Sequence, residues 1–381
     1  MRRQHLYLLL LFGLLLSSCR KDEVIYLSDA HQVAPPRVGS SIEGFYLLNE
    51  GNMGMNRATI DYFDYATGVY TRDLYSERNP NVVKELGDVG NDLKIYGSKA
   101  YAVINVSNYI EVFDVATGVH IEKINVPNCR YINFHNGKAY VSSYSGPIQV
   151  NPNAEVGFVA EIDTTTLKVT RQVSVGYQPE EMVIQNNKLY VANSGGYRVP
   201  NYDTTVAVVD LTSFSLIKKI DVAINVHRLQ VDKRGDIYVS SRGDFYHTEP
   251  NLYVIDSQSD EVKQKLDIPV SEMTISGDSL YYYSVAFKHS SGQNAISYGI
   301  LDTKSKKIVS DRIIKDGTDR NILIPYGIAV NPDTKEILIT DAQDYLVTGF
   351  VYCYSPEGIL KWKTTGGNIP AHIAFVRKKK P

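Results

Sequence analysis

The sequence is poor in the residues on which many classes of functional site depend. Its 381 residues include three cysteines, one tryptophan and eight scattered histidines. Without a CxxC pair or a cluster of cysteine and histidine, it has no pattern typical of a thiolate metal site. GxSxG, HExxH and phosphate-binding P-loop motifs are also missing, so no familiar catalytic constellation stands out.

The charge is nearly balanced, with 40 basic and 42 acidic side chains. Basic residues form no stripe of the kind that neutralises phosphates, so we expect no nucleic acid partner. Long hydrophobic runs are missing as well. The longest, residues 6–16, has 11 residues, too few for a membrane-spanning helix, which needs about 20.

That short run has the features of a secretory signal peptide, because Arg2 and Arg3 precede it. It ends in the sequence LSSC, which resembles a bacterial lipobox, and this resemblance implies cleavage before Cys19 and its acylation. The residues that follow, RKDE at 20–23, resemble the export signal that sends Bacteroidetes lipoproteins to the outer face of the outer membrane. The alternative is an ordinary signal peptide followed by a charged segment.

We therefore expect residues 1–18 to be a signal peptide and residues 19–41 to be a lipidated cysteine and a flexible tether, polar and interrupted by Pro35-Pro36. A multiply acylated anchor would hold the protein at the membrane. Cleavage would remove Arg2 and Arg3 and change the formal charge from −2 to −4.

What the chain has in abundance is short runs with strand-like alternation. A central unit at residues 181–222 contains four such runs, and two of them recur along the chain. One is typified by KAYV and KLYV. The other ends in an aspartate or its replacement, at Asp64, Asp114, Asp163, Asp210, Asp256, Asp302 and Ser355.

The spacings between these positions are 50, 49, 47, 46, 46 and 53 residues. A unit of four strands that repeats every 40–50 residues or so predicts a β-propeller. We expect an all-β fold over residues 42–381, with seven blades of four antiparallel strands. Cys129 and Cys353 would lie in different blades, so no structural disulfide is expected.

The first unit lacks its innermost strand, and the spare copy is at the other end of the chain, at residues 370–375. The C-terminal strand should therefore join the N-terminal blade and close the ring, which removes an open sheet edge. The repeats, such as VAVVDLTSFSLIKKIDV, resemble the YVTN-type repeats of surface-layer and YncE-like propellers. This resemblance is specific for the fold and says little about function.

Loop lengths distinguish the two faces of the predicted ring. Turns between first and second strands are tight, as are those between third and fourth strands, whereas loops between second and third strands are long. Binding residues concentrate on such loops when a rigid scaffold holds them. We call the face with the long loops the loop face.

The loop face is rich in tyrosine, asparagine and arginine, which suit a broad ligand with apolar area and many polar groups. The alternative for any one tyrosine is packing between blades. The predicted ligand-binding residues are Asn49, Asn52, Asn105, Asn108, Arg130, Tyr131, Tyr144, Tyr177, Asn193, Tyr197, Arg198, His227, Arg242, Tyr246, Tyr326, Tyr345 and His372.

Acidic and histidine side chains are also expected around the central pore. Glu181, His227, Glu272 and His372 would support a lyase or lactonase with a metal in the pore if they converged on one point. A binding protein for a glycan or another protein is a further alternative. We expect no catalytic residues, no resident cofactor and no protein-bound metal.

The signal, the repeat type, the length and the segment NEGNMG at residues 49–54 together resemble the BtuG-type surface lipoproteins of gut Bacteroidetes. The resemblance implies capture of cobalamin or a related corrinoid on the outer face of the outer membrane. It further implies transfer of this ligand to a TonB-dependent transporter. On this expectation tyrosines cover the apolar area of the corrinoid, while Asn and Arg pair with its amides and phosphate.

Overall fold

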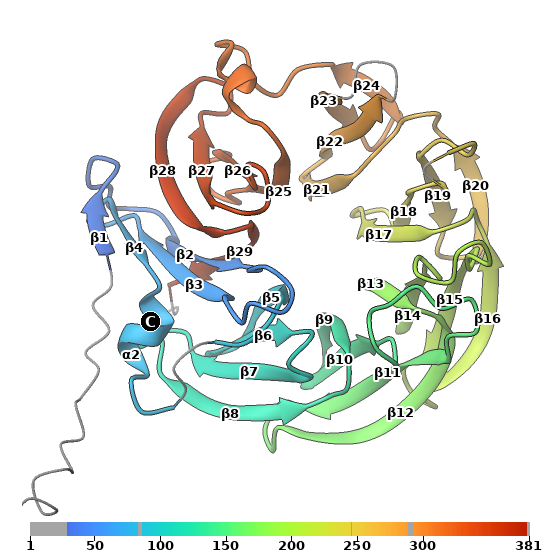
Figure 1. The fold of residues 1–381 in the computed structure, drawn as a ribbon. Coiled ribbons are helices and arrows are strands. Elements are labelled where there is room, and N and C mark those ends of the chain that lie inside the picture. Colours follow the sequence, from blue (N-terminus) through green and yellow to red (C-terminus); the bar gives the residue numbers. More distant parts are fainter. Residues whose placement is uncertain (1–28, 83–85, 245, 289–292, 379–381) are drawn as a thin grey trace, which may run out of the picture.

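The computed structural model of the chain describes residues 29–82, 86–244, 246–288 and 293–378. Seven β-sheets surround a central axis (Figure 1). Within the described residues, six sheets have four antiparallel strands and one has five. The prediction of a seven-bladed propeller is therefore confirmed. Cys19 and the predicted signal peptide lie outside the described residues.

Blades 2 to 7 each run along the chain from the innermost to the outermost strand. Blade 2 consists of β5 (Gly90–Tyr96), β6 (Lys99–Ile104), β7 (Tyr109–Asp114) and β8 (His120–Asn125). Blade 3 consists of β9 (Cys129–His135), β10 (Lys138–Ser143), β11 (Val156–Asp163) and β12 (Lys168–Tyr177). Blade 4 consists of β13 (Pro179–Gln185), β14 (Lys188–Asn193), β15 (Thr205–Asp210) and β16 (Ser215–Asp221).

The remaining three of these six blades follow the same plan. Blade 5 consists of β17 (Val226–Val231), β18 (Asp236–Ser241), β19 (Asn251–Asp256) and β20 (Glu261–Lys265). Blade 6 consists of β21 (Glu272–Ser276), β22 (Ser279–Lys288), β23 (Gln293–Asp302) and β24 (Lys307–Ser310). Blade 7 consists of β25 (Pro325–Val330), β26 (Ile337–Asp341), β27 (Thr348–Tyr354) and β28 (Leu360–Asn368).

Blade 1 is assembled from both ends of the chain, as the sequence predicts. Its inner strand β29 (Pro370–Arg377) pairs with β2 (Ile42–Asn49), which is followed by β3 (Thr59–Asp64) and β4 (Val69–Arg72). The register places Phe45 opposite Phe375 and Leu47 opposite Ile373. In Figure 1 the red β29 lies beside the blue β2, so the ring is closed by hydrogen bonds between the two ends.

The predicted tether extends too far along the chain. Residues expected to be flexible up to position 41 include a strand, β1 (Asp29–Gln32), which pairs antiparallel with β4. The pairing gives blade 1 its fifth strand. The reason is local: β4 is an outer edge with unpaired backbone groups, and an adjacent extended segment can satisfy them.

The tight turns have the conformations that their residues predict. In the turn from β9 to β10, Asn136 and Gly137 have φ angles of 47° and 75°, the left-handed region that Asn and Gly tolerate best. The aspartate that ends each third strand accepts backbone hydrogen bonds, as when Asp163 Oδ1 accepts from the amides of Thr165 and Thr166. These aspartates therefore stabilise the turns that follow the third strands.

The core consists of layers between neighbouring blades. Tyr101, Tyr190 and Tyr238, from the second strands of three blades, are fully buried. At the closing junction the one tryptophan, Trp362 on β28, packs against Phe45 and Phe63 with ring centroids 6.5 and 4.9 Å apart. The seven sheets therefore share their hydrophobic surface with both neighbours, which no sheet could bury alone.

Two short helices interrupt this pattern within the described residues, and neither is predicted from the sequence. They are α2 (Leu74–Arg78) in blade 1 and the 3₁₀ helix η1 (Thr318–Asn321) before β25. No helix in the described part of the chain has the length and apolar character needed to cross a membrane. Cys129 and Cys353 are buried free thiols, which agrees with the expected lack of a disulfide.

Residues 33–41 strap blade 1 to blade 7 after β1. The Arg37 guanidinium donates two hydrogen bonds of 2.9 Å to the carboxylate of Glu336, whose side chain is 3% exposed. Burial alone would raise the pKa of Glu336, but hydrogen bonds from Arg37, Lys361 and Thr334 lower it instead. The strap adds a charge-assisted bond to the closure made by β29.

We predict that Arg37→Ala lowers the free energy of unfolding by about 1.5–3 kcal/mol, the usual loss for a hydrogen bond to a charged group. Chemical denaturation followed by circular dichroism measures this change. Arg312→Ala, at an exposed arginine outside the strap, is the control. An unchanged unfolding midpoint in Arg37→Ala would show that residues 33–41 do not strap the blades together.

Candidate functional site

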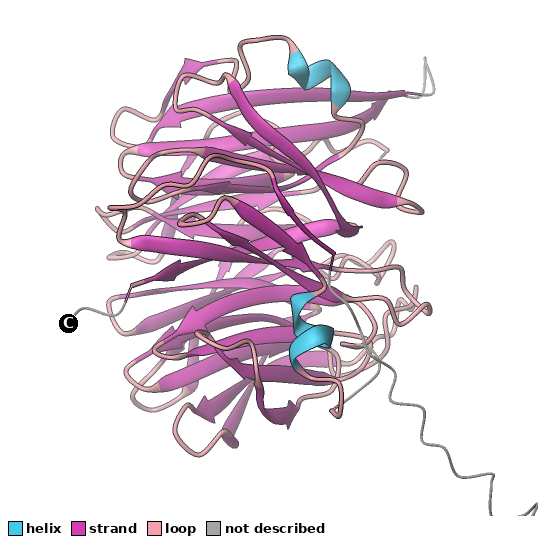
Figure 2. Ribbon diagram, turned by 90° about the vertical axis from the view of Figure 1, so that its left-hand side faces the viewer, coloured by secondary structure: helices cyan, strands magenta, loops and turns pink. Residues whose placement is uncertain are grey.

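The loop face is the part of the molecule with exposed aromatic side chains. Figure 2 shows the disc from the side, with loops at both ends of the strands. Among the described tyrosines, the three with exposed side chains are Tyr197, Tyr246 and Tyr345, at 37%, 78% and 39%. All three lie in loops between second and third strands, together with the exposed Met53, Met55, Val150, Val199, Leu346 and Val347.

Below this rim a carboxylate organises three of the predicted residues. Glu180, at the start of β13, is 1% exposed and forms ion pairs of 3.1 Å with Arg130 and 2.9 Å with Arg242. The Tyr144 hydroxyl donates a hydrogen bond to the same carboxylate. Burial alone would raise the pKa of Glu180, but the charges of the two arginines outweigh burial and lower it.

A second cluster surrounds Arg228, next to the Glu180 cluster and slightly further along the inner strands. The Arg228 guanidinium is 2.6 Å from the Glu272 carboxylate and donates a hydrogen bond to the Tyr131 hydroxyl, which lies 3.4 Å from His227 Nε2. Burial, together with the charges of Arg242, Arg228 and Arg130, lowers the pKa of His227 well below its usual range. The imidazole is therefore neutral at physiological pH and does not supply a positive charge.

The remaining side of the pore mouth is built by blades 1 and 7. Glu50, which follows β2, accepts a hydrogen bond of 2.8 Å from the Tyr326 hydroxyl and lies 3.3 Å from His372 Nε2. The Tyr345 ring packs edge-on against Tyr326, with centroids 5.9 Å apart. Three predicted residues therefore meet around a glutamate that the prediction omitted.

Two further predicted pairs are found on the loops of blades 3 and 4. The Arg198 guanidinium lies 3.5 Å from the centre of the Tyr177 ring, which is a close cation–π contact. Tyr197 packs edge-on against Tyr144 at 6.4 Å and so connects the rim with the Glu180 cluster. Tyr246, by contrast, has no ring partner among the described residues.

Five predicted asparagines hold the scaffold. Asn49, Asn105 and Asn193 are 0% exposed; the Asn105 amide, for example, donates to Asn128 Oδ1 and to the carbonyl of Cys129. These three side chains are buried and hydrogen-bonded within the scaffold, so ligand contact by them stays a prediction that this structure does not support. Asn108 occupies a left-handed turn, and Asn52 donates to the carbonyl of Tyr345.

Arg130, Tyr131, Tyr144 and His227 are largely buried as well. They lie under the rim and position it, whereas the exposed predicted side chains are Tyr197, Tyr246, Tyr345 and Asn108, and Arg242 is partly exposed. The loop face is therefore an exposed apolar and aromatic rim above a paired layer of buried charge. Such an arrangement can cover a broad ligand while its arginines and glutamates remain fixed.

The central channel holds a cavity of about 600 Å³ on the other side of this buried layer. Asp92, Tyr131, Glu181, Arg228, Glu272 and His372 line it near the loop face, and Tyr96, Phe134 and Phe375 line it toward the tight turns. The Arg228–Glu272 pair thus lies between the rim residues and the channel.

The pore acids do not converge as a metal site would require. Glu272 is paired with Arg228, and His372 lies beside Glu50. In the described ranges no group of three or more His, Cys, Asp or Glu side chains is placed to hold a metal ion. Glu181, Glu272 and His372 line the same cavity but do not form such a group.

Sequence reasoning left Glu50, Glu180 and Arg228 out of the predicted ligand-binding residues. The segment at residues 49–54, which contains Met53, was noted, but not the exposed apolar side chains of Met53 and Met55. Acidic residues beside strand ends, such as Glu50 and Glu180, were a usable signal. The partners of these acidic residues depend on contacts between blades, which the sequence of a single blade does not encode.

Comparison with known proteins supports the fold and adds a family. Residues 43–368 match the sequence profile of the family described as "Domain of unknown function (DUF5074)". The chain belongs to this family. No protein with a curated description matches it.

Solved structures with the same fold are distant in sequence. Hydrazine synthase from Kuenenia stuttgartiensis is 13% identical with a TM-score of 0.59, over 76% of this chain and 95% of that one. A quinonprotein alcohol dehydrogenase-like protein from Bacteroides thetaiotaomicron is 16% identical with a TM-score of 0.58, over 88% and 79%. At these identities the likeness of the DUF5074 propeller to both proteins concerns the fold alone.

The channel gives a testable pH dependence. Burial raises the pKa of Glu181 to about 7, and the charges of Arg228 and Lys94 only partly oppose this shift. An unfolded glutamate has a pKa of about 4.3. Between these two values the folded state keeps a proton that the unfolded state has lost, so this residue makes stability fall as pH rises through that window.

We predict that Glu181→Gln, which mimics the protonated carboxyl, becomes more stable relative to the original protein as pH rises from 5 to 8. The gain should amount to a few kcal/mol. Denaturant unfolding at both pH values measures it. Glu261→Gln, at an exposed residue of β20, serves as the control; equal pH dependence of all three proteins would contradict the raised pKa.

Proposed function

We propose that this protein is a surface lipoprotein that captures a corrinoid such as cobalamin on its loop face. The observation that carries the proposal is the placement of all exposed described tyrosines in the long loops of that face. A corrinoid is broad and partly apolar, and its edge carries amides and a phosphate. Rigid aromatic side chains cover such area at a low cost in conformational entropy.

The layer beneath the rim supports this proposal. Arg130, Arg242 and Glu180 are fixed by ion pairs and by the Tyr144 hydroxyl, so little order has to be gained when a ligand binds. Arg242 is still one-third exposed. It is the arginine of this cluster best placed to meet a polar group of the ligand.

The start of the described chain supports a position above an outer-membrane transporter. Asp29 pairs with Arg72, the last residue of β4, and β4 runs from the tight turns toward the loop face. A lipid on Cys19 would be joined to Asp29 through nine intervening residues, which span at most roughly 30 Å. The anchor would then hold the loop face near the membrane, where a captured corrinoid could pass to a TonB-dependent transporter.

Titration calorimetry of a soluble form that starts after residue 22 with cyanocobalamin tests the proposal. We expect a one-to-one complex of nanomolar affinity or tighter. Absence of heat, and of retained pink colour after desalting, would overturn corrinoid capture. A glycan array would then test the sugar-binding alternative, and metal analysis with assays for lyase and lactonase activity the enzymatic one.

A substitution on the rim gives a sharper test. We predict that Tyr246→Ala and Tyr345→Ala each weaken corrinoid binding by about tenfold or more, because exposed aromatic anchors dominate interface energies. Ile217→Ala, at an exposed residue on β16 outside the loop face, should leave the affinity unchanged. Binding that is insensitive to both tyrosines would place the ligand elsewhere.

A further inference from the structure

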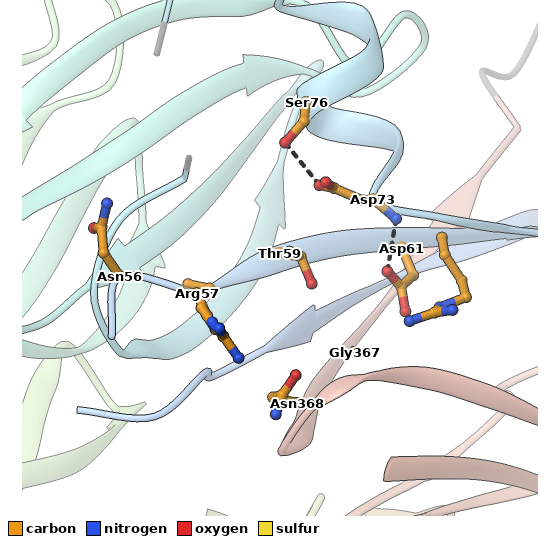
Figure 3. A pocket seen from close by; sticks show the side chains of 10 residues that line it. Asn56, Arg57, Thr59, Asp61, Asp73, Ser76, Gly367 and Asn368 are labelled. Carbon is orange, nitrogen blue, oxygen red and sulfur yellow. Dashed lines mark hydrogen bonds between the residues drawn. The ribbon is translucent and has the colours of Figure 1, made fainter. Parts of the chain in front are cut away.

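A second pocket lies between the outer parts of blades 1 and 7, separate from the channel. It has a volume of about 250 Å³ and is bounded by the start of β3, the end of β4, helix α2 and the end of β28 (Figure 3). Its polar lining includes Arg57, Thr59, Asp61, Arg72, Asp73 and Asn368. None of these residues belongs to the loop-face clusters described above.

The two arginines of this pocket have unused hydrogen-bonding capacity. Among the described residues, none forms an ion pair or a side-chain hydrogen bond with Arg57, which is exposed. Arg72 Nε is buried and has no hydrogen-bond partner in the described part of the chain. The Arg72 Nη1 contact with Asp29 is long, at 3.6 Å, and Asp29 is 66% exposed, so this ion pair is weak.

The two acids of the pocket, in contrast, are already satisfied. Asp61 is 1% exposed; its oxygens accept hydrogen bonds of 2.7 Å from the Tyr70 hydroxyl and 2.9 Å from the Asp73 amide. Asp73 accepts a hydrogen bond of 2.8 Å from the Ser76 hydroxyl. Figure 3 shows the Asp61–Asp73–Ser76 chain on one side of the pocket and Arg57 on the other.

Burial also makes these two acids harder to ionise. It raises the pKa of Asp61, and it raises the pKa of Asp73 to about 6. The guanidinium groups are always charged. The groups with donors to offer are therefore cationic, while the carboxylates are occupied from within the fold.

The geometry points to an oxyanion site in this pocket, which takes the phosphate of a small phosphorylated molecule or free phosphate. Two arginines line this one pocket, and guanidinium groups pair well with phosphate oxygens. The volume is below the 300–1,000 Å³ or so of drug-sized sites, so the ligand is small. This site is additional to corrinoid capture and does not depend on it.

Calorimetric titration at constant ionic strength with phosphate, glucose 6-phosphate and glucose tests the site. We expect one-to-one binding of phosphate and glucose 6-phosphate with a dissociation constant on the order of a millimolar, and no binding of glucose. A markedly tighter complex with glucose 6-phosphate than with phosphate identifies a phosphorylated molecule as the ligand; equal affinities identify free phosphate.

Two substitutions locate the bound anion. Arg57→Ala and Arg72→Ala should each weaken phosphate binding by about tenfold, since each removes a charge-assisted bond. Arg57 is exposed before the first residue of β3, so Arg57→Ala should fold even if Arg72→Ala does not. Arg320→Ala, at an exposed arginine of η1, removes the same charge elsewhere and should have no effect.

The opposing outcomes are distinct. Phosphate binding that Arg57→Ala leaves unchanged would mean an adventitious ion only. Binding of glucose with the same affinity as glucose 6-phosphate would identify a neutral sugar pocket. Binding of Ca²⁺ that competes with phosphate would assign the pocket to its acids. Each of these results would overturn the proposal.

Discussion

The rest of the structure depends on one constraint: a ring of sheets must close. Each blade buries its two hydrophobic faces against its two neighbours. An unclosed ring would therefore leave one hydrophobic face exposed at each of its two ends. Closure here is noncovalent and rests on the pairing of β2 with β29. It is reinforced by Trp362, which packs against Phe45 and Phe63, and by the Arg37–Glu336 strap. The loop face keeps its shape only because this junction holds.

The ring also accounts for the way charge is organised at its centre. Seven inner strands approach the same axis, and each brings a polar residue to the same level. In solvent these charges would be weakly coupled, but here they are desolvated and must pair across blades, as Glu180 does with arginines from β9 and from the loop after β18. This layer of paired charges separates the aromatic rim from the channel cavity, so the two regions can bind different kinds of ligand.

Much of the fold follows from the sequence because the repeat is periodic and the turns are short. The aspartates from Asp64 to Asp302 mark the third strands, and the unmatched run at 370–375 already identifies the closing strand. The candidate site is harder to predict, because the sequence does not show whether a loop-face residue such as Asn105 or Tyr197 is buried or exposed. One is completely buried and the other is exposed, and the difference comes from contacts between blades. The strand β1 was missed for a similar reason, since residues 29–32 lack strand-like alternation and their partner β4 lies 40 positions away.

The position of the closing strand has a consequence for the time course of folding. Blade 1 is complete only when Leu47 has paired with Ile373, which lies more than 320 positions later in the chain. Contacts of such long range slow folding. A chain that crosses a membrane N-terminus first would expose the edge of β2 throughout its passage and could seal it only when the last strand had emerged. If the protein is secreted as proposed, its most vulnerable interval falls between secretion and closure, and a partner that shields β2 during that interval would protect it from aggregation.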